Sequence, residues 1–181
     1  MRVTLETDRL LLRPYTEDDA DAMFNGWAGD EKVTEFLTWN AHRSVAETRL
    51  LLEAWVREYE KPERLNFAIV LKEEGKLIGS IDVVGYEGAP SGAPVLGYCL
   101  SRAYHNRGIM TEACKRVISY LFERGFSEVR IDAMPENAAS NAVIKKCGGI
   151  LIGVCERERP AKNDTVRINR YVIRKTEGSY C

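Results

Sequence analysis

The hydrophobic residues of this chain fall into two patterns, short apolar runs and longer stretches in which apolar residues recur at helical spacing. The short runs are typical of strands and predict them over 10–13, 65–71, 77–84, 94–100, 129–133, 150–154 and 166–173. Helical spacing predicts four helices, one capped by Thr16, one capped by Ser44, and two over 114–122 and 138–146. Gly148-Gly149 ends the last helix.

These elements follow one another without an internal repeat or a linker. Their order is strand, two helices, three strands, helix, strand, helix, two strands. It predicts an α+β fold, a mixed αβα arrangement with helices on both faces of one mixed sheet. At 181 residues the chain has the size of one domain. We therefore predict a single domain over residues 1–181, with an ordered core over about 7–174 and a short C-terminal tail.

Composition narrows the class of protein. The chain is 45% hydrophobic and 29% charged, as soluble globular proteins are. A net charge of −1 gives no broad positive field, so we expect no nucleic-acid partner. We see no apolar signal region and no stretch long enough to span a bilayer, which predicts a cytoplasmic protein without membrane contact. Five cysteines without C-x-x-C spacing and two histidines give no reason to expect a metal site.

One stretch, Tyr104-His105-Asn106-Arg107-Gly108-Ile109-Met110-Thr111-Glu112-Ala113, indicates a site for an anion. It follows the predicted strand over 94–100 and leads into the predicted helix over 114–122. The first turn of a helix has N–H groups without internal partners, and the peptide dipoles place roughly half a positive charge there. A strand, a turn with glycine and a basic residue, and then a helix start would suit a pyrophosphate.

Four blocks along the chain, in this order, are Thr7-Asp8-Arg9-Leu10-Leu11-Leu12-Arg13-Pro14, Leu77-Ile78-Gly79-Ser80-Ile81, Arg107-Gly108-Ile109-Met110-Thr111-Glu112-Ala113 and Asn137-Ala138-Ala139-Ser140-Asn141-Ala142-Val143-Ile144-Lys145-Lys146-Cys147-Gly148. Together they resemble the GNAT superfamily of N-acetyltransferases, and more closely its RimJ/RimL branch, over about residues 7–174. The resemblance implies the GNAT fold, with six to seven strands, two central strands splayed apart, and about four helices. It also implies acetyl-CoA as cosubstrate, a primary amine as acceptor, and a monomer or homodimer.

The resemblance assigns cofactor-binding residues to this chain. The backbone amides of the loop Asn106, Arg107, Gly108, Ile109, Met110 and Thr111 would hold the CoA pyrophosphate, and Gly108 allows close approach because it lacks a Cβ. Leu100 and Ser101 would pair with the pantetheine arm as if it were another strand. Asn137 would touch that arm, and Ser140 would lie near the sulfur.

The chain departs from the family pattern at several positions. His105 stands where Gln or Arg is common, and Met110 replaces a small residue, but a loop that acts through its N–H groups tolerates both. Ile144 stands where many members have a tyrosine that protonates the leaving thiolate. Val95 stands where a glutamate base is common. The catalytic acid and base must therefore come from other residues, or from water.

Three residues are candidates for catalysis, and each has a plainer interpretation. Ser140 is either a general acid near the sulfur or a solvated serine in a first helical turn. Asp82 interrupts an apolar strand and faces either the active cleft or solvent. Tyr98 lies at the mouth of the expected slot, or is a core tyrosine with its hydroxyl satisfied. Asn137 can also be a helix N-cap. Cys99 is interpreted as a buried hydrophobic residue rather than a nucleophile.

Acetyl transfer to an amine needs a neutral nitrogen. An α-amine with a pKa near ~8 is roughly one-tenth neutral at pH 7, against roughly one part in two thousand for lysine. We therefore expect direct attack on acetyl-CoA by a primary amine, with a protein or peptide N-terminus favoured over a lysine side chain. Three alternatives stay open: a CoA-binding sensor without transferase activity, an acetyltransferase of a small amine, and a nucleotide-binding protein. The last lacks the usual phosphate-loop patterns.

Overall fold

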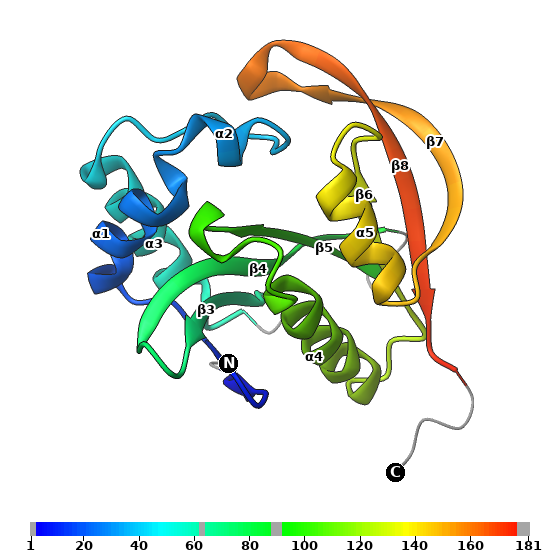
Figure 1. The fold of residues 1–181 in the computed structure, drawn as a ribbon, viewed down its shortest axis with the longest axis horizontal. Helices are drawn as coiled ribbons and strands as arrows, with labels where there is room; N and C mark the ends of the chain where they lie inside the picture. Colours follow the sequence, from blue (N-terminus) through cyan, green and yellow to red (C-terminus); the bar gives the residue numbers. More distant parts are fainter. Residues whose placement is uncertain (1–2, 62–63, 88–91, 177–181) are drawn as a thin grey trace.

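A single mixed sheet organises the chain, with strands in the order β1-β2-β3-β4-β5-β6-β8-β7. The computed structural model describes residues 3–61, 64–87 and 92–176 (Figure 1). Within them the strands are β1 Leu5–Glu6, β2 Leu10–Arg13, β3 Asn66–Leu71, β4 Lys76–Glu87, β5 Ala93–Leu100, β6 Glu128–Ala133, β7 Ile150–Arg159 and β8 Asp164–Arg174. Residues 88–91, between the predicted strands over 77–84 and 94–100, and residues 177–181, at the end of the expected tail, lie outside the described residues.

The sheet has eight strands, so the expectation of six to seven was too low. The additional strand is β1, which pairs two residues with β2. Two residues are too few to produce an alternating pattern in the sequence. The seven predicted strands all form, although several are longer than predicted; β7 and β8 extend toward each other as one long hairpin.

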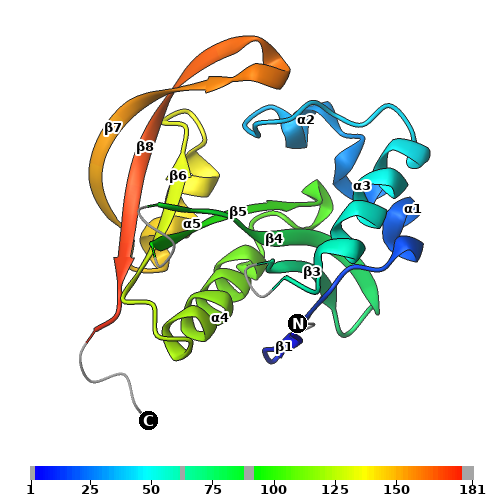
Figure 2. The ribbon, with the colours of Figure 1, turned by 180° about the vertical axis from the view of Figure 1, so that it is seen from behind.

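Helices cover both faces of the sheet, as the element order predicted. The helices are α1 Ala20–Met23, α2 Glu31–Thr34, α3 Val45–Glu58, α4 Ile109–Glu123 and α5 Ala138–Lys146. α4 packs on one face, where buried residues such as Val117 and Leu121 meet Phe67 and Ile81 of the strands. α1 and α3 pack on the other face, in a second cluster around Trp27. Figure 2 shows this arrangement from behind.

The single helix predicted after Thr16 is wrong in detail. The chain instead forms a 3₁₀ turn over Glu17–Asp19, then α1, then a π-helical turn over Phe24–Ala28. The Asp19 carboxylate accepts two hydrogen bonds of 2.7 Å from the Arg13 guanidinium, which ties the start of the segment to the end of β2. π-helical turns are rare and often occur at functional sites. Here the turn carries Trp27, which is fully buried.

The sheet opens at its centre, between β5 and β6. These two strands run parallel, and their pairing is limited to Val95 with Arg130 and Leu96 with Ile131. Each strand continues beyond its last partner, β5 to Leu100 and β6 to Ala133. The splayed central strands implied by the family resemblance are therefore present.

The β7–β8 hairpin reaches over the sheet to the segment 34–40 that follows α2 (Figure 1). Arg159 donates hydrogen bonds to the carbonyl oxygens of Glu35 at 2.8 Å and Leu37 at 3.1 Å. Lys162 Nζ lies 2.8 Å from the carbonyl oxygen of Thr34, and Asn40 Nδ2 lies 2.6 Å from that of Ala161. The hairpin and the segment 34–40 therefore form one roof on this side of the molecule.

Candidate active site

The loop before α4 presents free backbone donors to solvent. Asn106 and Gly108 both have positive φ, 60° and 72°, which turns the chain sharply into the helix. In the described part of the chain, no acceptor takes a hydrogen bond from the amides of residues 106–111. Free amides at the start of a fifteen-residue helix are the donors that an anion site requires. The sequence predicted an anion site at this loop, and the structure has these donors there.

The start of α4 is held in position by the β1–β2 turn. The Glu112 carboxylate accepts hydrogen bonds from Thr7 Oγ1 at 2.5 Å and from Arg9 Nε at 2.7 Å. These bonds, together with the charge of Arg9, hold the pKa of Glu112 below its usual value, against the opposing effect of burial. Arg9 also donates to the carbonyl oxygen of Arg107 at 3.0 Å. The first predicted family block and the third thus meet at the anion site.

The opening between β5 and β6 has backbone groups along its β5 edge. Ser101 N–H donates to the carbonyl oxygen of Ile78 at 2.8 Å, toward β4. Because backbone groups alternate along a strand, Leu100 and Tyr98 direct theirs away from β4, toward the opening. The Leu100 carbonyl lies 2.9 Å from His105 Nε2, which ties the strand to the loop.

Of the two residues expected to pair with a pantetheine arm, Leu100 is therefore suitably placed and Ser101 is not. Both backbone groups of Ser101 are engaged within the protein, because its carbonyl accepts from Tyr104 N–H at 3.0 Å. The alternation of the strand directs the backbone groups of Tyr98, and not those of Ser101, toward the opening. Ile109 and Met110, the first two residues of α4, have their side chains buried in the core, so only their backbone groups can face a ligand.

The start of α5 faces the same opening. Asn137 Oδ1 accepts from Ser140 N–H at 3.0 Å, so Asn137 is the N-cap of the helix, as its alternative interpretation stated. Ser140 Oγ lies 2.9 Å from Tyr98 Oη. Burial raises the pKa of Tyr98 far above its ordinary value, so its hydroxyl stays protonated and can donate to Ser140. The structure thus joins two of the three predicted catalytic residues.

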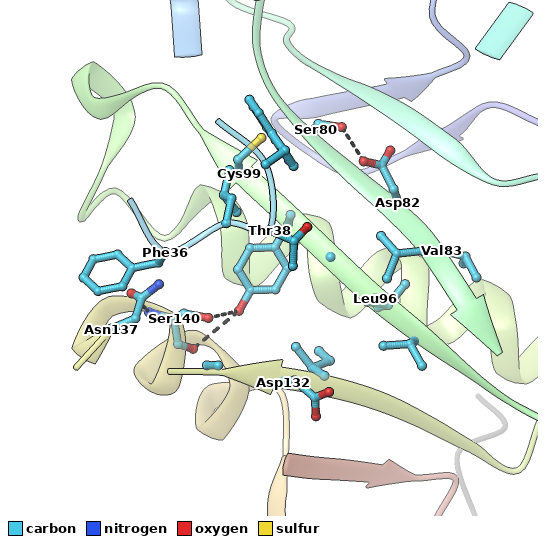
Figure 3. A pocket seen from close by; sticks show the side chains of 18 of the residues that line it. Phe36, Thr38, Ser80, Asp82, Val83, Leu96, Cys99, Asp132, Asn137 and Ser140 are labelled. Atoms are coloured by element: carbon cyan, nitrogen blue, oxygen red, sulfur yellow. Dashed lines mark hydrogen bonds between the residues drawn. The ribbon is translucent and has the colours of Figure 1, made fainter. Parts of the chain in front are cut away.

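A cavity of about 500 Å³ lies on the sheet face opposite α4, beneath the roof. Ser80 and Asp82 of β4 contribute to its lining, and so do Asn137 and Ser140 at the start of α5 (Figure 3). Asp82 pairs in register with Gly97, the first residue of β5 beyond its contact with β6. The carboxylate is therefore carried on the strand next to the opening, within a cavity that also reaches Ser140.

The environment of Asp82 changes its ionisation. Burial raises the pKa of Asp82 to about 7, and the hydrogen bond from Ser80 and the charge of Arg64 offset part of that rise. Ser80 Oγ donates to Asp82 Oδ2 at 2.9 Å. The other oxygen, Oδ1, has no hydrogen-bond partner among the described residues and no contact with solvent. A carboxylate in a cavity with a pKa near 7 is suited to act as a general base.

The two positions where many family members have a catalytic acid or base have apolar residues in this chain. Ile144 is completely buried in the core, and Val95 lines the cavity. Cys99 also lines the cavity, but burial raises the pKa of its thiol, so it is a poor nucleophile. Sequence reasoning did not assign Trp39 or Arg64 to the site. Neither stands in a motif, and the fold alone brings them to the cavity.

The family model described as "Acetyltransferase (GNAT) domain" matches residues 9–150. The chain therefore belongs to the GNAT acetyltransferases, and it is an N-acetyltransferase with the fold of that family. It is 28% identical over 145 residues to the uncharacterized N-acetyltransferase YoaA of Bacillus subtilis, covering 80% of this chain and 81% of YoaA.

Solved structures with the same fold include two of named activity. RimL, a ribosomal L7/L12 alpha-N-protein acetyltransferase, superposes with a TM-score of 0.83 at 20% identity, over 97% of this chain and 96% of RimL. The microcin C7 self-immunity acetyltransferase MccE, solved with acetyl-CoA and AMP, gives a TM-score of 0.83 at 19% identity, over 93% of this chain and 94% of MccE. Within the described residues, no helix is long and apolar enough to cross a membrane.

Proposed function

We propose that this protein transfers an acetyl group from acetyl-CoA directly to a primary amine, with an α-amine favoured over a lysine side chain. The observation that carries the proposal is a set of unpartnered amides at the start of α4, close to a sheet opening that leads to a cavity with an ionisable carboxylate. A diphosphate fits the amides, and an extended arm fits the strand edge of Tyr98 and Leu100. When bound, acetyl-CoA supplies the activated acyl group as a thioester.

In this proposal Asp82 handles the proton of the acceptor. Amines enter largely as ammonium ions, which an ionised Asp82 attracts. Asp82 then takes the proton, directly or through a water, and the neutral nitrogen forms its bond to the acyl carbon as the carbon–sulfur bond breaks. Removing a proton from an α-amine of pKa near ~8 is about 3 kcal/mol easier than from a lysine of pKa near ~10.4, whichever base accepts it. A base with a pKa near 7 is better matched to the first.

Ser140 and Tyr98 would handle the proton of the leaving sulfur. In this proposal Tyr98 is the donor of the 2.9 Å hydrogen bond to Ser140 Oγ, which leaves the serine proton free to point into the opening. That proton would pass to the sulfur and convert the leaving thiolate to a thiol, while the second proton that the nitrogen loses as it becomes an amide would return through water to the Ser140 oxygen. This pair takes the place of the tyrosine that many relatives have where this chain has Ile144.

The test is incubation of the protein with acetyl-CoA and two peptides, one with a free α-amine and a twin with a blocked α-amine and one lysine. We expect release of free thiol together with a mass increase of one acetyl group on the first peptide. Preference for the blocked twin would contradict the α-amine proposal. Binding of acetyl-CoA without thiol release, over a broad panel of amines, would support a sensor instead of an enzyme.

A further inference from the structure

The part of the cavity away from α5 is built from large apolar side chains. They come from α1, from the π-helical turn, from α3 and from the roof segment, and they are Met23, Trp27, Phe36, Leu37, Trp39, Leu51 and Trp55. Aromatic walls of this kind bind apolar and aromatic groups, since each ring removes a large area from water. Thus the same cavity has a carboxylate on the sheet and an aromatic compartment beside it.

The charges of the cavity wall are almost all compensated within the protein. The charged residues that line it are Arg64, Asp82, Asp132, Arg157 and Arg159. Arg64 Nε lies 3.2 Å from a Glu58 oxygen, and Arg159 pairs with Asp164 at 2.5 Å. Arg157 pairs with Asp132.

Among the described residues, Asp82 is the one charged side chain of this wall in no ion pair. An ammonium group would find a carboxylate here without a competing cation at contact distance. A carboxylate or phosphate on the acceptor would find each arginine already paired. Burying an anion without a partner is costly, so the wall discriminates against acidic acceptors.

The roof limits how the acceptor lies. The guanidinium of Arg159 is almost completely buried and fixes the segment 35–37 over the cavity through two carbonyl oxygens. The group attached to the reacting amine must therefore lie in the compartment between the roof and the sheet. A small polar group there would leave the aromatic wall in contact with water.

From this arrangement, and resting on the proposed function, we infer that the acceptor is a primary amine with a large apolar or aromatic group and no anionic group beside the amine. Such an amine has two possible sources, a small aromatic or aliphatic amine and a peptide whose first residue has a large apolar side chain. Both place the ammonium at Asp82 and the apolar group among Trp27, Trp39 and Trp55.

The experiment measures kcat/KM, by thiol release from acetyl-CoA, for a matched set of acceptors. We expect 2-phenylethylamine to exceed ethylamine at least about tenfold, because of the buried ring. We also expect it to exceed phenylalanine at least about tenfold, although phenylalanine has the less basic amine, because of the added carboxylate. A tripeptide amide that begins with phenylalanine should exceed its twin that begins with serine by a similar factor.

The peptide pair and the small amines distinguish the two sources. Either source supports the inference when the acceptor with the larger apolar group has the higher kcat/KM. Equal rates for 2-phenylethylamine and ethylamine, or for the two peptides, would overturn it. So would phenylalanine reacting as fast as 2-phenylethylamine. If no amine in the set releases thiol, the proposed function has failed, which is a different result from a reactive but unselective enzyme.

Two variants connect the preference to the cavity. Trp39→Ala removes an aromatic wall residue that is partly exposed and packs 5.3 Å from the His42 ring. It should reduce the ratio of kcat/KM for 2-phenylethylamine to kcat/KM for ethylamine at least about threefold. The matched control is Leu50→Ala, on the exposed side of α3, where the side chain is 66% exposed. It should leave the ratio unchanged; an unchanged ratio in Trp39→Ala, with acetyl-CoA binding intact by calorimetry, would overturn the inference.

Discussion

Asp82→Asn distinguishes a functional carboxylate from a structural one, because the two roles predict opposite effects on stability. Burial raises the pKa of Asp82 from 3.8 to about 7 in the folded protein. Above pH 7 the fold must hold an ionised group that the unfolded chain ionises freely. At 1.36 kcal/mol per pKa unit, ionised Asp82 lowers the free energy of unfolding by up to roughly 4 kcal/mol at pH 8.

Asparagine removes this charge but leaves a buried amide, which offsets about 1–2 kcal/mol of the gain. We therefore expect Asp82→Asn to be more stable than the parent by about 2 kcal/mol at pH 8, a rise in Tm of roughly 4–8 °C for a chain of this size. The gain should shrink as the pH falls from 7 toward 4, because the folded parent then keeps Asp82 protonated and the penalty decreases.

Activity should move in the other direction. Loss of a general base lowers kcat/KM by about 10²–10³-fold at pH 8. In the parent, kcat/KM should rise about tenfold between pH 6 and pH 8, as a base with a pKa of about 7 loses its proton. That rise should be absent in Asp82→Asn.

The assay combines thermal unfolding at pH 5, 6.5 and 8 with kcat/KM for one acceptor over the same range. Glu73→Gln is a suitable control, since Glu73 is an exposed carboxylate in the β3–β4 turn. It should change neither stability nor the pH profile. Asp82→Asn that is less stable than the parent at pH 8, or that keeps the parent's rate and pH profile, would refute the reasoning.

Three further predictions concern the cosubstrate site and the proton donor. Gly108→Ala places a Cβ at φ +72° without a steric clash, so the strain of about 1 kcal/mol should weaken acetyl-CoA binding about fivefold by calorimetry. Gly125→Ala, at φ +96° in the turn after the other end of α4, is also strained and should leave binding unchanged. Ser140→Ala and Tyr98→Phe should each lower kcat about tenfold with little change in the KM for acetyl-CoA, and Ser119→Ala is the control. If kcat changes less than a few-fold in both variants, the two residues do not protonate the leaving sulfur. Glu112→Gln weakens the bonds to Thr7 and Arg9, so both Tm and acetyl-CoA affinity should fall, whereas Glu123→Gln near the other end of α4 should affect affinity little.

The fold could be predicted from the sequence wherever periodicity was long enough to be unambiguous. The helix over 138–146 and the turn at Gly148 are where the pattern placed them, because an N-cap, an apolar stripe and a glycine with positive φ agree there. The segment after Thr16 was predicted as one helix, but the ion pair of Asp19 with Arg13 is a tertiary contact that local periodicity does not encode.

The loop before α4 was predictable for the same reason, since strand, turn and helix start are consecutive in the sequence. The cavity was not. Strand alternation left Asp82 two possible directions, and only the packing of α1, α3 and the roof on this face makes its side a cavity. Arg159 ends the charged stretch 156–159, yet the structure buries it within the roof. Contacts between residues more than a hundred positions apart decide this, and no local pattern contains them.

The short parallel contact between β5 and β6 has a mechanical consequence. Two residue pairs are all that connect these strands in register, so the two halves of the sheet meet at a narrow hinge. A ligand lying along Tyr98 and Leu100 would add backbone hydrogen bonds across that hinge and so connect the two halves of the sheet. Amide hydrogen exchange on both strands should then slow together when acetyl-CoA binds. The amine would therefore bind to a sheet whose two halves bound acetyl-CoA already holds together.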